Sequence, residues 1–155
     1  MLDKMMRHVK NMIKYAKSGG VVYINFSKVQ PSKRFEGKRV LITGGSSGIG
    51  LETAKEYLAE GAEVIITGRH GKTLEEAARK LASDKLHTVI WDVSDVKIIS
   101  EKLQESVQLL NGSNIDIFVN NAGIYVSENL AEYDESTYDS IMATNTKGLF
   151  FMCQA

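Results

Sequence analysis

Short apolar runs alternate with segments of helical periodicity over residues 37–155, and this alternation constrains the fold more than any other feature of the sequence. The runs are apolar throughout, which is typical of strands that are buried on both faces. Such strands, separated by helices, predict a parallel α/β sheet with helices on both sides. We expect strands at 40–43, 64–67, 86–91 and 116–119, and helices at 48–60, 73–82, 95–110 and 135–152. In a sheet of this kind, ligands bind beyond the carboxyl ends of the strands.

Two local signals bear on where these helices begin and end. Gly61 is expected to follow the end of the first helix, because glycine is common directly after a helix. Thr73 and Glu76 have the spacing of a capping box, which predicts that the second helix opens at Thr73.

Charge divides the chain into two segments. Residues 1–36 hold eight basic and two acidic residues, a net charge of +6, whereas residues 37–155 hold eleven basic and seventeen acidic residues, a net charge of −6. The only proline, Pro31, lies near the boundary. We therefore expect residues 1–36 to form a basic N-terminal extension and residues 37–155 to form the main domain. The negative main domain argues against binding of nucleic acid.

The extension itself has a basic amphipathic pattern. Apolar residues recur at steps of three and four over residues 1–17 with lysines and an arginine between them, which predicts a helix that ends at Gly19 and Gly20. Residues 21–26 are expected to form a strand. The simplest interpretation is a helix that packs on the protein's own body. Contact with a membrane surface or a partner helix stays open, and a mitochondrial presequence is disfavoured because arginine and serine are scarce.

Composition excludes several classes of protein. A content of 43% hydrophobic residues excludes a disordered chain, and the single cysteine, Cys153, cannot form an internal disulfide. No apolar run approaches the roughly 18 residues of a membrane span, and no secretory signal is visible. We expect a cytoplasmic protein and no metal site.

The glycine-rich segment Thr43–Gly50, with the sequence TGGSSGIG, joins the first strand to the first helix. Glycines let a backbone turn tightly and approach a ligand closely, and a helix N-terminus offers free N–H groups to a pyrophosphate. A tight turn without a ligand is the alternative interpretation. The strand–turn–helix context favours a dinucleotide site, and the absence of a following Gly-Lys-Ser/Thr excludes a Walker phosphate loop.

This spacing of glycines resembles the classical short-chain dehydrogenase/reductase family, whose turn reads Thr-Gly-x3-Gly-Ile-Gly. Three further positions match: Asp92 after the third strand, the Asn-Asn-Ala-Gly segment at 120–123 after the fourth, and Asn145 in the last helix. The resemblance spans residues 37–155. It implies a Rossmann-like, doubly wound parallel sheet that is truncated after the fourth strand and the helix following it.

The resemblance also implies roles for these residues in binding a nicotinamide cofactor. Gly44, Ser46, Ser47, Gly48, Ile49 and Gly50 would seat the pyrophosphate, Asp92 and Val93 the adenine, and Asn120, Ala122 and Gly123 the ribose. Asn145 is the one implied catalytic residue, and would position a water in a proton relay. Simpler alternatives are that Asp92 caps the following helix and that Asn145 is an ordinary helical residue.

Arg69 bears on which cofactor is bound. Dinucleotide folds selective for NAD carry an acid at the end of the second strand, where this chain has Gly68 followed by Arg69. A guanidinium can bind a 2′-phosphate through two hydrogen bonds. Electrostatics and resemblance therefore favour NADP(H) over NAD(H), with a solvated surface arginine as the alternative. His70 is expected to be a solvent-exposed residue without a role.

The family's acid–base residues are missing from this chain. In the family, a Tyr and a Lys four residues later act with a Ser, but none of the six tyrosines here has Lys at that position. The resemblance implies an NADP(H)-dependent oxidoreductase that acts on a small carbonyl or alcohol, with a 3-oxoacyl thioester as a weakly favoured substrate. The 155 residues alone are expected to be inactive. A non-catalytic NADP(H)-binding module or pseudoenzyme is the alternative function.

The expected last elements would leave an apolar surface. The fourth strand would be an open edge, and residues 149–152 would be exposed beside it. We therefore expect the natural protein to continue past Ala155, or else this chain to self-associate. The family resemblance also implies a homo-oligomer.

Overall fold

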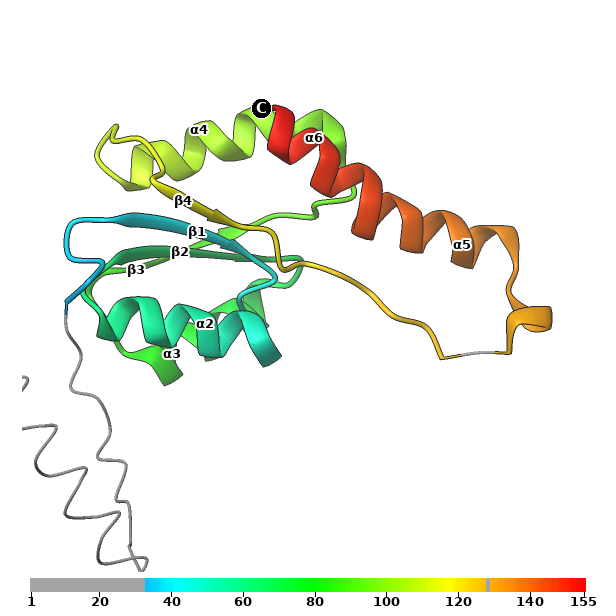
Figure 1. The fold of residues 1–155 in the computed structure, drawn as a ribbon, viewed down its shortest axis with the longest axis horizontal. Coiled ribbons are helices and arrows are strands. Elements are labelled where there is room, and N and C mark those ends of the chain that lie inside the picture. The colour runs from blue at the N-terminus through cyan, green and yellow to red at the C-terminus, as the bar shows by residue number, and fades with distance from the viewer. Residues whose placement is uncertain (1–32, 128) are drawn as a thin grey trace, which may run out of the picture. The chain divides into compact units, whose positions relative to one another are not determined.

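The computed structural model describes residues 33–127 and 129–155 (Figure 1). The expected helix over residues 1–17 and the strand over residues 21–26 lie outside these residues. Within the described part, Phe35 packs edge-on against Tyr57 with ring centroids 4.8 Å apart, and Arg34 pairs with Glu60. The boundary between an extension and a main domain at residue 36 stays a prediction. None of the helices in the described part has the length and apolarity needed to cross a membrane.

Four parallel strands form the sheet of the described residues, in the order β3-β2-β1-β4. Their bounds are β1 Arg39–Thr43, β2 Glu63–Gly68, β3 Leu86–Ile90 and β4 Ile117–Val119. The predicted parallel α/β sheet is confirmed. The chain steps outward from β1 to β3 and then returns to the other side of β1, so the topological switch lies between β1 and β4.

Helices cover both faces of this sheet (Figure 1). The helices α2 (Gly48–Ala59) and α3 (Gly71–Leu81) lie on one face, and α4 (Ile99–Leu109) lies on the other. A 3-10 turn, η1 (Val96–Ile98), leads into α4, and a second, η2 (Leu130–Glu132), follows β4. The last helix is continuous but has three parts: α5 (Glu135–Met142), a π-helical turn η3 (Ala143–Gly148), and α6 (Leu149–Gln154).

Successive residues of the strands supply two separate cores. Val40, Ile42, Val64 and Ile66 pack under α2 and α3, while Leu41 and Ile65 pack on the opposite side with Val89, Trp91 and Met152. Side chains of a strand alternate between the two faces of a sheet, and here both faces are covered by a core. After their first residue, β1 and β2 therefore consist almost entirely of apolar residues and Thr. Burying one such aliphatic side chain contributes about 1.5–3 kcal/mol.

Two expectations about helices are wrong. The helix α3 begins at Gly71, so Thr73 lies inside it and its hydroxyl donates to the carbonyl of His70 at 2.8 Å instead of capping the helix. Met152 is buried at 4% exposure, because α6 turns this side chain onto the core. Leu149, Phe150 and Phe151 are exposed, as expected.

An ionic clamp joins β1 to the residue just before β4. The carboxylate of Asp116 accepts hydrogen bonds from the Arg39 Nε at 2.8 Å and the Arg39 amide at 3.0 Å. These bonds lower the pKa of Asp116 from 3.8 to about 2. Since β4 is short and pairs only with β1 among the described strands, the clamp fixes where β4 starts.

A hydroxyl clasp joins the same two strands at their carboxyl ends. The buried Thr43 Oγ1 accepts from the amides of Asn121 at 3.1 Å and Ala122 at 3.0 Å. In return, the Asn121 Nδ2 donates to the carbonyls of Thr43 at 3.0 Å and Gly44 at 3.1 Å. The clasp therefore holds the segment after β4 against the turn after β1.

Substituting Asp116→Asn should make acid stability less dependent on pH. Because the folded pKa of Asp116 lies below its unfolded value, its contribution is fully present above about pH 4 and is lost as pH falls toward about 2. The difference between wild type and variant in the free energy of unfolding, from urea denaturation, should shrink over that interval. Asp84→Asn is the control, since Asp84 has no hydrogen bond or ion pair to any described residue. A difference that is constant with pH would contradict the assignment.

Substituting Thr43→Val should destabilise the protein by about 2–3 kcal/mol, because two partly buried amides each lose their acceptor. Thr43→Ser keeps the hydroxyl and should cost only about 1 kcal/mol, the loss of one buried methyl group. Chemical denaturation of both variants measures the two costs. Since valine keeps the methyl group and removes only the hydroxyl, a Thr43→Val loss no larger than the Thr43→Ser loss would contradict the clasp.

Candidate cofactor site

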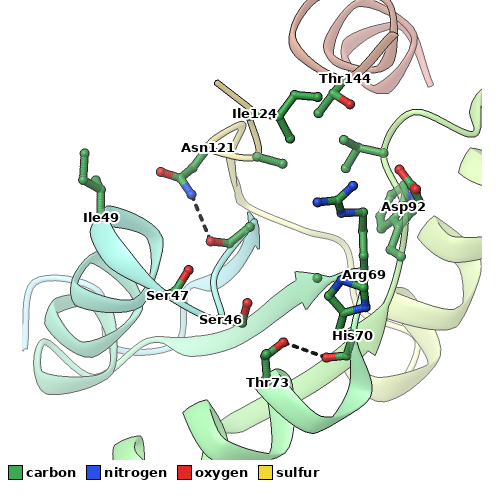
Figure 2. A pocket seen from close by; sticks show the side chains of 16 residues that line it. Ser46, Ser47, Ile49, Arg69, His70, Thr73, Asp92, Asn121, Ile124 and Thr144 are labelled. Carbon is green, nitrogen blue, oxygen red and sulfur yellow. Dashed lines mark hydrogen bonds between the residues drawn. The ribbon is translucent and has the colours of Figure 1, made fainter. Parts of the chain in front are cut away.

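A cavity of about 430 Å³ opens at the carboxyl ends of the strands (Figure 2). Its walls come from the carboxyl ends of the strands and the turns that follow them, from Ile49 and Thr73 in the first turns of α2 and α3, and from Thr144 of η3. The cavity therefore lies at the topological switch between β1 and β4, where sheets of this order bind ligands. Of the residues expected to bind a cofactor, nine line it: Gly44, Ser46, Ser47, Ile49, Arg69, Asp92, Val93, Ala122 and Gly123.

The glycine-rich turn forms one wall. Gly44 has a φ of +65°, and a Cβ there would lie 2.9 Å from the Cα of Ala122, so a larger residue would push the two turns apart. Gly48 has a φ of +54°, and a Cβ there would meet no atom within 4 Å, which leaves open space at the first residue of α2. Gly48 and Gly50 do not line the cavity: Gly50 is buried behind the turn.

Arg69 and His70 form a second wall, at the end of β2 (Figure 2). Neither the guanidinium nor the imidazole has a hydrogen bond or ion pair with any described residue. Gly68 also lines the cavity, and a Cβ on it would lie 3.2 Å from the Ser46 Oγ. The position that is acidic in NAD-selective folds thus carries no side chain here, and the cation next to it has no partner among the described residues.

Asp92 serves the loop after β3 and the cavity together. Its Oδ1 accepts from the amide of Ser94 at 2.9 Å and from the Ser94 Oγ at 2.7 Å. This one carboxylate oxygen therefore holds the loop after β3, as the alternative interpretation of Asp92 expected. The residue also lines the cavity with Val93 and Trp91. The Nε1 of Trp91 is buried and has no partner in the described part of the chain.

The two asparagines after β4 point in different directions. Asn120, which was expected beside the ribose, does not line the cavity, and its Nδ2 instead donates to the Sγ of Cys153 at 3.3 Å. Asn121 lines the cavity while holding the turn after β1 through the hydroxyl clasp. The side chain of Asn120 is thus turned toward α6, and that of Asn121 toward the turn after β1.

Asn145 lies in the π-helical turn η3 and is hydrogen-bonded to the segment after β4. Its Oδ1 accepts from the amide of Ile124 at 2.8 Å and its Nδ2 donates to the carbonyl of Ile124 at 2.9 Å. The side chain thus pairs with both backbone groups of one residue, as a neighbouring strand would. Asn145 does not line the cavity. A role for Asn145 in positioning a water stays a proposal, and both polar atoms of its side-chain amide already bond to Ile124.

Sequence reasoning missed seven lining residues: Gly68, His70, Thr73, Trp91, Asn121, Ile124 and Thr144. Six of them lie within two residues of a position that was singled out, so extending each motif by two residues would have included them. The sequence predicts a capping role for Thr73. In the structure, α3 starts two residues earlier, and Thr73 lies in its first turn and in the cavity wall.

The residues of the cavity fit a phosphorylated dinucleotide. The first N–H groups of α2 and α3 point their positive ends toward this edge of the sheet, and hydroxyls of Ser46 and Ser47 lie beside them. Arg69 supplies a cation that no described residue neutralises. Trp91, which lines the cavity after β3, has a buried Nε1 that lacks a partner in the described part of the chain.

Comparison with known proteins gives consistent relatives. The chain is 36% identical over 121 residues to gluconate 5-dehydrogenase of Gluconobacter oxydans, covering 77% of this chain and 46% of that protein. It is 36% identical over 119 residues to an NADP-dependent (R)-specific alcohol dehydrogenase of Lentilactobacillus kefiri, covering 76% and 46%. Among solved structures, the 3-ketoacyl-(acyl-carrier-protein) reductase of Brucella melitensis, complexed with NADH, superposes with a TM-score of 0.71 at 31% identity, covering 77% and 48%.

The chain spans about half the length of the curated relatives it matches. A family model described as short chain dehydrogenase matches residues 38–155, which include all four strands and every residue of the cavity. This match covers most of the chain and shows that the chain belongs to the short-chain dehydrogenase family.

Proposed function

We propose that the protein is an NADP(H)-dependent oxidoreductase that transfers a hydride between nicotinamide and a small carbonyl or alcohol. The observation that carries the cofactor preference is the Arg69 guanidinium in the cavity, which no described residue pairs with, next to Gly68 where NAD-selective folds carry an acid. One relative is an NADP-dependent alcohol dehydrogenase, which supports the proposal, while a similar structure was solved with NADH.

Each wall of the cavity has a role in this proposal. The turn after β1 and the first N–H groups of α2 bind the pyrophosphate, Arg69 binds the 2′-phosphate, and the segment after β3 faces the adenine. Ala122 and Gly123 flank the ribose, and Asn121 holds their segment in place. When bound, the cofactor supplies the hydride chemistry, and these residues hold and orient it.

The substrate is the less constrained half of the proposal. Relatives of this chain include dehydrogenases of gluconate and of alcohols and a 3-ketoacyl reductase, all of which act on a carbonyl or hydroxyl carbon. We therefore propose 3-oxoacyl thioesters as the first substrates to assay.

Assembly into a homo-oligomer, through a surface that includes the exposed Phe150 and Phe151, and a cytoplasmic location are further parts of the proposal.

A non-catalytic NADP(H)-binding module is the second candidate function. The observation that favours it is the lack of any Tyr followed four residues later by Lys in these 155 residues. Turnover of NADPH with a panel of ketones and 3-oxoacyl thioesters separates the two candidates. Binding with turnover by the purified natural protein supports the enzyme. Binding without turnover supports the module, and the 155 residues alone should bind without turnover.

Substituting Arg69→Gln should weaken NADPH binding by about tenfold to a hundredfold, because a charge-assisted bond to phosphate contributes about 1.5–3 kcal/mol. NADH binding should be unchanged, since NADH lacks the 2′-phosphate. Titration calorimetry with both cofactors measures the two effects. Lys72→Gln is the matched control, because Lys72 is a nearby cation that does not line the cavity. An equal loss of affinity for both cofactors would refute the assigned role.

A further inference from the structure

We infer that His70 is a second ligand of the adenosine 2′-phosphate, so that protonation of its imidazole increases the preference for NADP(H) as pH falls. This inference rests on the proposed NADP(H) function and adds a regulation to the same site. Sequence alone suggested a solvent-exposed histidine without a role. The structure leaves His70 exposed, as expected, and also places its side chain in the wall of the cavity, directly after Arg69 (Figure 2).

The backbone around His70 holds the residue at the entrance of a helix. His70 occupies the position before α3, and its carbonyl accepts from the Thr73 Oγ1 at 2.8 Å and the Leu74 amide at 3.2 Å. The imidazole is left without a hydrogen bond to any described residue. A phosphate near it would also face the positive end of the α3 dipole, which favours an anion.

The other charged side chains near His70 carry charges of both signs. Of the sixteen residues that line the cavity, the titratable ones are Arg69, His70 and Asp92. Lys72 follows on α3. The cavity is also lined by neutral side chains from the turn after β1, Ser46 and Ser47, and from α3, Thr73. Asp92 is thus the one anionic side chain among the sixteen lining residues, and a bound phosphate dianion would be the largest new charge beside His70.

Histidine is the side chain whose charge ordinarily changes between pH 5 and 8. A bound phosphate dianion favours the imidazolium form, and linkage requires that the imidazolium equally favours the phosphate. The phosphate's own protonation near pH 6 acts in the opposite direction, because it removes negative charge. Without His70, the preference for a 2′-phosphate should therefore stay level or fall as the solution becomes more acidic.

The test compares two nucleotides that differ only in the 2′-phosphate: adenosine 2′,5′-bisphosphate and adenosine 5′-monophosphate. Calorimetric titration of the purified natural protein at about pH 6 and about pH 8 gives the ratio of their affinities, without any turnover. In wild type, the ratio should be about fivefold larger at the lower pH, the effect of one exposed ion pair. In His70→Gln, this increase should disappear.

The matched control is His87→Gln, the other described histidine, which pairs with Glu63 at 2.9 Å and does not line the cavity. It should keep the wild-type increase. A His70→Gln variant that also keeps the increase, or a wild type that shows none, would overturn the role of His70. Failure of wild type to distinguish the two nucleotides at either pH would overturn the proposed NADP(H) preference instead, which separates the two failures.

Discussion

The position of β4 against β1 is the constraint on which the cavity depends. Only three residues of β4 pair with β1, so backbone pairing alone gives this contact few hydrogen bonds. The Asp116 clamp adds bonds at one end, and the buried Thr43 hydroxyl accepts two amides at the other. Since the second set lies directly under Gly44 and Ala122, the same bonds that hold β4 also set the distance between two walls of the cavity.

Asn145 shows how a residue that is unfavourable locally becomes favourable through a distant partner. Asparagine has low helix propensity, and here it lies in a π-helical turn that interrupts an otherwise regular helix. The compensation is a pair of hydrogen bonds to the backbone of Ile124, whose amide and carbonyl both lie in a segment outside the regular helices and strands. The long helix is thereby tied to the loop that forms the cavity's far wall.

Charge is distributed unevenly around the cavity. Arg69 and His70 lie at the end of β2, where the first turn of α3 adds its positive dipole end. Asp92 lies after β3 and already uses one oxygen for the loop. An anionic group of a ligand is therefore favoured at the end of β2, and a hydrogen-bond donor of the ligand is favoured beside Asp92. This distribution agrees with a nucleotide whose ribose phosphate lies near Arg69.

Much of this protein could be read from the order of its residues. Apolar runs buried on both faces specify strands wherever they lie, and the glycine-rich turn after the first run indicates a phosphate site because both signals are local. The identity of the lining residues could not be read in this way. Whether Asn120 or Asn121 faces the cavity, whether Met152 is buried, and whether Thr73 caps α3 depend on which side of each segment meets the core. Neighbouring side chains point in different directions, and only the packing of distant elements determines which direction is inside.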